Sequence, residues 1–291
     1  MRTRRRSAIL AHGLLIIVSI ATIAASLGVI GYCLFDSAKA EERLSGRRPT
    51  YLAGPLDANP LDNYGLVFGV GHNSGASLTT IHQALAAGAD VIEIDVVPMG
   101  DTLISAHDVP LPIVGREVFR GPTLGQAWRA AADAEVIQLD VKVSTPFVRQ
   151  KLIHFLDTHP TNQTVMIATS DITLLEQIQA AHPQVYRFLG IADAATLKRL
   201  TSDPDLAAML DGVTIRHQLV TPDSIAKLKA MNLIVLAWTV NDLATVNALV
   251  EMGVDAVSTD NLAIMHLLSG NQSGERRLAE HRANQVLGSR F

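Results

Sequence analysis

Short apolar runs alternate with amphipathic segments along most of this chain. The runs are apolar at consecutive rather than alternate positions, which is typical of parallel strands covered on both faces. They predict strands at 66–70, 91–97, 135–141, 163–168, 185–189, 212–215, 233–239 and 256–259. Between them, apolar residues recur at helical spacing, which predicts helices at 78–87, 123–132, 146–158, 173–182, 194–200, 222–231 and 243–252. Thr123, Thr221 and Asp242 stand where such helices begin and are expected to cap them.

Eight strand–helix units within about 200 residues favour a closed (β/α)₈ TIM barrel. An open, doubly wound sheet is the alternative fold, but the glycine-rich phosphate and dinucleotide motifs of many such folds are absent from the sequence. Residues 98–122 form an insertion after the second predicted strand, and 102–106 are expected to add a hairpin strand there.

The N-terminal segment 1–35 differs from the rest. Four arginines precede residues 8–34, a run of 27 residues without a formal charge, which predicts an uncleaved transmembrane helix. The arginines should stay cytoplasmic, which places the following domain on the extracytoplasmic side. A cleaved signal peptide ending near 38–40 is the alternative. We expect a linker at 36–64, the barrel at 65–268 and a polar tail at 269–291, part of it a short exposed helix.

Composition narrows the class of function. Hydrophobic residues make up 48% of the chain and charged residues 18%, enough apolar material for a full core. Outside 1–35, twenty basic residues face twenty-eight acidic ones, a formal charge of −8 that argues against nucleic-acid binding. Cys33, in the apolar run, is the only cysteine, so no intramolecular disulfide can form. Nothing in the sequence fixes the oligomeric state.

Carboxylates gather where predicted strands end. Glu93 and Asp95 are two residues apart and therefore share one face of a strand. Asp140 and Lys142 have the same relation at the end of the next barrel strand. Buried carboxylates are costly unless a cation pairs with them. The three oxygen ligands suit Ca²⁺ or Mg²⁺ rather than zinc. The alternative is that Lys142 merely balances the acids.

Other candidate residues lie at strand ends too. His72 and His107 are placed for proton transfer, because imidazole titrates near neutral pH. Trp238 closes the seventh strand, where it could form a wall for the organic part of a substrate or belong to the core. Asp260 follows the last strand, and we expect it to cap the next helix.

Three stretches together resemble the glycerophosphodiester phosphodiesterase family over roughly residues 66–268. The first is GHNSGASLTTIHQALAAGADVIEIDV (71–96), similar to the family's histidine motif, first helix and Glu-x-Asp strand. The second combines the His-Asp element at 107–108 with the Asp-x-Lys strand end at 140–142. The third is LIVLAWTVNDLATVNALVEMGVDAVSTDN (233–261), with a Trp-Thr-Val-Asn strand and a Thr-Asp ending.

The resemblance implies a (β/α)₈ barrel with an acid–base pair, a cation site and a phosphate contact. In this chain His72 and His107 would form the pair, Lys142 would contact phosphate, and the cation ligands would be Glu93, Asp95 and Asp140. Two positions depart from the family. Asn73 stands where the family usually has arginine, and could donate a neutral hydrogen bond to phosphate instead. Asp140 stands where glutamate is common.

The sequence thus predicts metal-dependent hydrolysis of a glycerophosphodiester to an alcohol and glycerol phosphate. The nucleophile is either water or a neighbouring substrate hydroxyl. One alternative is a phospholipase-type enzyme that cleaves phosphoinositide, sphingomyelin or lysophospholipid and works beside the membrane. Another is a membrane-tethered binding domain with a degenerate site.

Overall fold

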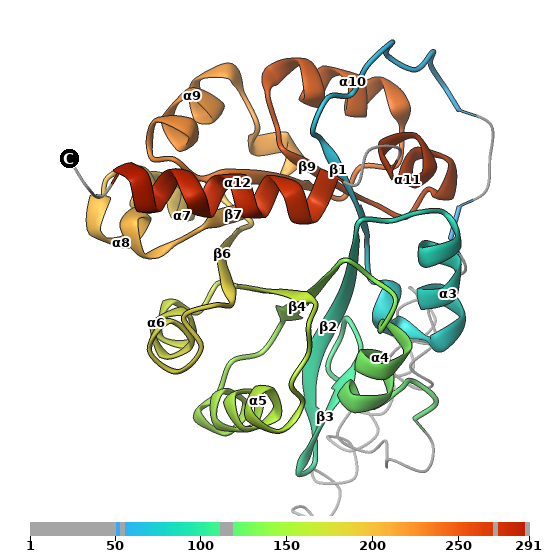
Figure 1. Ribbon diagram of the computed structural model, residues 1–291, viewed down its shortest axis with the longest axis vertical. Helices are drawn as coiled ribbons and strands as arrows, with labels where there is room; N and C mark the ends of the chain where they lie inside the picture. The colour runs from blue at the N-terminus through green and yellow to red at the C-terminus, as the bar shows by residue number, and fades with distance from the viewer. Residues whose placement is uncertain (1–50, 53–55, 111–118, 270–272, 289–291) are drawn as a thin grey trace, which may run out of the picture.

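The computed structural model describes residues 51–52, 56–110, 119–269 and 273–288 (Figure 1). The transmembrane helix expected in 1–35 and most of the 36–64 linker lie outside these ranges. Among the residues within them, no helix combines the length and apolar character needed to span a bilayer.

The described chain forms a closed barrel of parallel strands. One sheet has the order β1-β9-β8-β7-β6-β5-β4-β2-β3, and an additional β1–β2 pairing closes it. Only β3 runs antiparallel, against β2, so eight parallel strands remain in the barrel. The strands are β1 Phe68–Gly71, β2 Val91–Met99, β3 Thr102–Ser105, β4 Val136–Val141, β5 Thr164–Thr169, β6 Tyr186–Ile191, β7 Gly212–Arg216, β8 Ile234–Trp238 and β9 Ala256–Thr259. The predicted barrel and hairpin strand are confirmed, and the open sheet is excluded.

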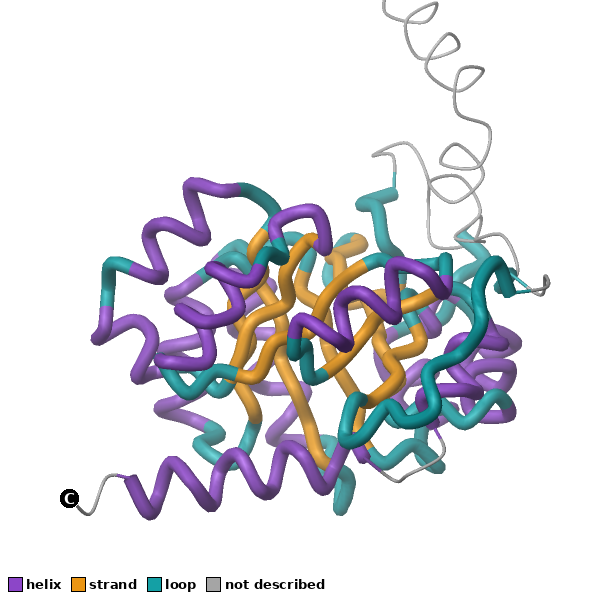
Figure 2. Tube along the Cα trace, turned by 90° about the horizontal axis from the view of Figure 1, so that it is seen from above, coloured by secondary structure: helices purple, strands orange, loops and turns teal. Residues whose placement is uncertain are grey.

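Helices surround the strands on the outside (Figure 2). They are α3 Leu78–Ala86, α4 Leu124–Ala130, α5 Pro146–Thr158, α6 Ile172–Ala181, α7 Ala194–Thr201, α8 Pro204–Met209, α9 Pro222–Ala230, α10 Leu243–Met252, α11 Leu262–Leu268 and α12 Ser273–Gly288, with single 3₁₀ turns at η1 Ser74–Ala76 and η2 His217–Leu219. The three predicted caps are confirmed: Thr123, Thr221 and Asp242 each accept a backbone N–H three residues on.

The C-terminal tail differs from its prediction. It forms α12, a helix of sixteen residues that lies against the barrel (Figure 1). Leu278 on this helix is fully buried and belongs to the same apolar cluster as the inward-facing Phe68, Tyr186 and Ile234. The helix is therefore neither short nor fully exposed: it covers the N-terminal end of the barrel. Its mostly polar composition hid Leu278, which packs into the barrel.

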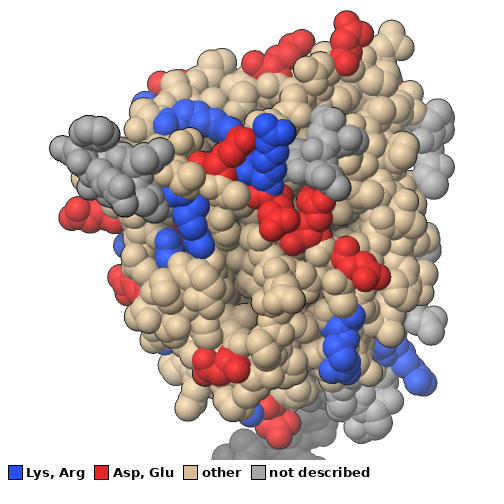
Figure 3. All heavy atoms as spheres, viewed as in Figure 1, with Lys and Arg blue, Asp and Glu red and all other residues tan. Residues whose placement is uncertain are grey.

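Aspartates reinforce the same end of the barrel. Asp90, Asp211 and Asp255 each stand immediately before a strand and accept a backbone N–H from a neighbouring strand, at 2.8, 2.9 and 2.7 Å respectively. Arg277 of α12 donates from Nη2 to Asp255 Oδ1 at 2.5 Å, and Lys229 Nζ donates to Asp255 Oδ2. On the face drawn in Figure 3, basic and acidic side chains accordingly lie interspersed. These contacts give α12 a polar attachment beside its apolar one.

Leu278→Ala should lower the free energy of unfolding by about 2–5 kcal/mol, because it leaves a cavity under the barrel. Leu78→Ala is the matched control. Leu78 is 44% exposed, so its truncation should change stability by only about 0.5 kcal/mol. Urea unfolding followed by circular dichroism measures both. Equal effects of the two substitutions would show that α12 is not part of the barrel's core.

Candidate active site

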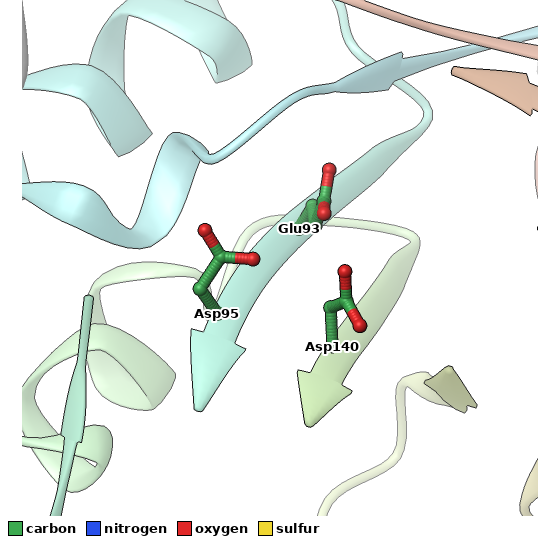
Figure 4. A group of neighbouring side chains, drawn as sticks. All are labelled: Glu93, Asp95 and Asp140. Carbon is green, nitrogen blue, oxygen red and sulfur yellow. The ribbon is translucent and has the colours of Figure 1, made fainter. Parts of the chain in front are cut away.

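Two neighbouring strands carry the acidic cluster. Glu93 and Asp95 lie on β2 and Asp140 on β4, and Asp95 and Asp140 are direct partners in the strand register. Figure 4 shows the three carboxylates on the same side of these strands. One oxygen from each lies within 4.8 Å of the others. The predicted convergence of the three acids is therefore present.

Lys142 lies beside this cluster. Its Nζ is 2.8 Å from Asp95 Oδ1 and 2.5 Å from Asp140 Oδ2. This is the charge-balancing arrangement that the sequence left open as an alternative to a cation site. Burial lowers the pKa of Lys142, but Asp140 and Asp95 outweigh that effect, so the pKa is raised and the amine stays charged. A cation that enters the cluster must compete with this ammonium group.

Glu93 and Asp95 titrate in opposite directions. Burial and the neighbouring Asp95 carboxylate raise the pKa of Glu93 to about 7, although His72 and Lys142 oppose the rise. Burial also disfavours ionised Asp95, but Lys142 and His107 overcome it and hold its pKa below the usual range. Glu93 therefore holds its proton to higher pH than an ordinary glutamate, and a bound cation would favour the carboxylate.

His72 is fixed through both ring nitrogens. Its Nδ1 lies 2.8 Å from Asp260 Oδ1, and its Nε2 lies 3.1 Å from Thr239 Oγ1. Burial lowers the pKa of His72, but Glu93 and Asp260 outweigh it and raise the pKa above 6.5. With Nδ1–H donating to the carboxylate, Nε2 is the nitrogen left to exchange a proton.

The helix-capping role predicted for Asp260 is wrong. Asn261 caps α11 instead, accepting from the backbone N–H groups of Ala263 and Ile264. Asp260 holds His72 with one oxygen and accepts from Asn241 Nδ2 with the other, at 3.0 Å. Its position directly after a barrel strand, the criterion that selected His72, could have indicated this role.

His107 completes the histidine pair. Its ring centroid lies 6.5 Å from that of His72, and its Nδ1 lies 3.4 Å from Asp108 Oδ1. Its side chain is 34% exposed, against 12% for His72. The two imidazoles therefore face one region from a buried and a more solvent-exposed position.

A cavity of about 290 Å³ lies between these groups. Its lining includes both histidines, Trp238 and, from the charged cluster, Glu93, Asp140 and Lys142. Trp238 thus stands at a cavity wall, with the Arg216 guanidinium carbon 5.7 Å from its ring centroid. Asn73 is buried and is not among the lining residues. Its backbone N–H donates to Glu93 Oε2 at 3.3 Å, so Asn73 contacts the carboxylate of Glu93 without lining the cavity.

Several polar residues that line the cavity were not predicted from the sequence. Gln138 lies on β4 beside Glu93, and Ser258 on β9 donates to Glu93 Oε2 at 3.3 Å. Thr214 on β7 and Thr169 on β5 are also part of the lining. The two-residue period that links Asp140 to Gln138 was the available signal, but a neutral amide in a strand did not stand out.

The donor set fits a divalent cation. Three carboxylates converge in a buried position with one ammonium group as their close cationic partner. Oxygen ligands of this kind are those that Ca²⁺ and Mg²⁺ prefer. Glu93, Asp95 and Asp140 are the residues that would hold the ion.

The model of the glycerophosphoryl diester phosphodiesterase family matches residues 123–264. This family match supports a phosphodiesterase enzyme. An Oleispira antarctica phosphodiesterase, solved in complex with the product sn-glycerol-3-phosphate, is 21% identical with a TM-score of 0.57, over 68% of this chain and 94% of that one. No curated protein shows significant sequence similarity to the chain.

Two further solved structures share the fold. A glycerophosphodiester phosphodiesterase from Thermotoga maritima is 15% identical with a TM-score of 0.55, over 70% of this chain and 98% of that one. A glycerophosphoryl diester phosphodiesterase from Parabacteroides distasonis is also 15% identical, with a TM-score of 0.56 over 79% and 98%. At this level of identity the structures establish the shared barrel.

Asp260→Asn should lower the pKa of His72, because it removes a carboxylate that favours the imidazolium. NMR titration of the chelator-treated protein measures this value. Asp108→Asn, which alters the partner of His107 instead, should change the His72 pKa far less. An unchanged or higher pKa in Asp260→Asn would contradict the role assigned to Asp260.

Proposed function

We propose that this protein hydrolyses glycerophosphodiesters to an alcohol and glycerol phosphate, with a divalent cation and the pair His72 and His107. The observation that carries the proposal is the convergence of both histidines, Glu93, Asp140 and Lys142 around one cavity, with Asp95 beside them in the acidic cluster. The family match over 123–264 and the product named for the Oleispira enzyme support the choice of substrate.

Each residue of the site would have a separate role. Lys142 would bind a phosphate oxygen, while Glu93, Asp95 and Asp140 hold the ion. Bound there, Ca²⁺ or Mg²⁺ would supply Lewis-acid stabilisation of charge on the phosphate. His72 exchanges a proton at Nε2 and is kept in that tautomer by Asp260. His107, with its ring centroid 6.5 Å from that of His72, exchanges the second proton, so that one histidine serves the nucleophile and the other the leaving oxygen.

His72→Ala or His107→Ala should lower kcat on a glycerophosphodiester by about 10²–10⁴-fold, with little change in substrate binding, because each removes a proton-transfer group. Release of glycerol phosphate is measured with chelator, and again with Ca²⁺ or Mg²⁺ restored. His82→Ala, at an exposed position on α3, is the matched control. Normal turnover in either mutant of the pair, or full activity in chelator, would contradict the mechanism.

Cation binding should release protons near pH 7 and progressively fewer as the pH rises, because the pKa of Glu93 is raised and Glu93 must ionise to become a ligand. Titration calorimetry in two buffers with different ionisation enthalpies measures the release. Glu93→Gln should abolish most of it. Identical heats in both buffers at pH 7 would show that the cation does not displace the Glu93 proton.

A lysophospholipid is the second candidate substrate. The exposed large apolar side chains among the described residues are Leu52, Leu78, Val109 and Phe147. Leu78 is the first residue of α3, which follows β1, and Phe147 is the second residue of α5, which follows β4. Leu52 forms a β-bridge with Asn261, which follows β9. These three side chains therefore lie near strand ends on the side of the cavity mouth. A predicted anchor at 1–35, with the barrel on the extracytoplasmic side, would bring this rim to a membrane. Faster cleavage of a lysophospholipid than of its deacylated diester would favour this candidate.

A further inference from the structure

The cavity floor holds a buried amide that the proposed mechanism does not use. Gln138 is 2% exposed and lines the cavity together with Glu93 and Asp140. It is the register partner of Glu93 on the adjacent strand, so both side chains leave the sheet on the same side. Two residues further on, Asp140 shares that face. Gln138 therefore lies level with Glu93 and one layer below the pair of Asp95 and Asp140, at the wall of the cavity where substrate would bind.

The Gln138 amide lacks a hydrogen-bond partner for its oxygen within the described part of the chain. Leaving a buried acceptor unpaired costs about 1–3 kcal/mol, which makes it a poor choice for purely structural packing. Two neighbouring hydroxyls at the cavity, by contrast, already have protein partners. Ser258 Oγ donates to Glu93 and Thr169 Oγ1 donates to the Val141 carbonyl. Their donors are committed to the protein, whereas no protein group among the described residues takes up the Gln138 side-chain oxygen.

The chemistry of an amide indicates what that ligand offers. A carboxamide both donates and accepts hydrogen bonds, and the terminal bond that orients it rotates between two broad positions. A substrate hydroxyl has the same dual character, whereas a phosphate oxygen only accepts and an alkyl chain does neither. The charged groups near the mouth already suit the phosphate. A neutral amide on the floor suits the polyol portion.

We infer that Gln138 hydrogen-bonds a hydroxyl of the glycerol moiety and so selects glycerol phosphate esters over esters of simple alcohols. This inference rests on the proposed function, since it assigns a residue to the substrate of that same cavity. It makes Gln138 a specificity-determining residue, distinct from the cation ligands and from the histidine pair.

The test compares ligands within one protein. Binding of sn-glycerol 3-phosphate, inorganic phosphate and the monophosphate of 1,3-propanediol to the full chain is measured by calorimetry in the presence of Mg²⁺. The 1,3-propanediol ester lacks the secondary hydroxyl, and the wild type should bind glycerol 3-phosphate at least roughly tenfold more tightly than the propanediol phosphate that lacks the hydroxyl contacted by Gln138. The monophosphate of 1,2-propanediol, which lacks the terminal hydroxyl, identifies which of the two is contacted.

Gln138→Leu should remove most of this preference and leave the affinity for inorganic phosphate unchanged within about twofold. Gln138→Asn keeps the amide on a shorter stem and should retain part of the preference. Unchanged phosphate binding shows that the cavity is intact, so a folding defect is separated from a lost contact.

Retention of the full preference in Gln138→Leu, or an equal loss for all ligands, would overturn the inference. So would a wild type that does not distinguish glycerol 3-phosphate from the propanediol phosphates. Because these are binding measurements, they are independent of turnover. Absence of glycerophosphodiester hydrolysis alongside selective glycerol phosphate binding would count against the proposed reaction and support the Gln138 contact.

Discussion

At the mouth of this barrel, three carboxylates lie beside one ammonium group, that of Lys142. The chemistry of the site depends on this excess of negative charge. The crowding follows from backbone geometry: Glu93 and Asp95 share a strand face, and parallel register places Asp140 beside Asp95. Lys142 contacts two of the three acids. Burial and repulsion from the neighbouring carboxylates raise the pKa of Glu93 to about 7. Protons and cations are therefore alternative partners for the same group.

The two ends of the barrel use aspartate in contrasting ways. At the base, Asp90, Asp211 and Asp255 accept backbone N–H groups, and Asp255 also accepts from a side chain of α12. These hydrogen bonds tie neighbouring strands together and stabilise the fold. At the mouth, Asp260 is bonded to His72 and serves to orient it. This division agrees with the general placement of stability at the N-terminal face and chemistry at the C-terminal face of such barrels.

The sequence predicted the barrel because its strands are continuous apolar runs, a signal that depends on burial alone. It also predicted the meeting of the acids and histidines, because strand ends in a parallel barrel converge. It misjudged features that depend on tertiary partners. The six-residue α8 was too short to show a helical period, and in α12 the buried Leu278 stands in a mostly polar stretch. Asp260 and Asn261 both suit a helix cap, and only their contacts distinguish them. Gln138 became visible as a candidate only when the structure placed it in the cavity lining.

The most direct test of the central claim is a crystal structure grown or soaked with Mn²⁺, whose anomalous scattering locates the ion. The account predicts a single strong peak bounded by Glu93, Asp95 and Asp140, with the Lys142 ammonium displaced from at least one of its two carboxylate contacts. A cluster without anomalous density, in which Lys142 keeps both contacts at saturating Mn²⁺, would contradict the claim that these acids are a cation site.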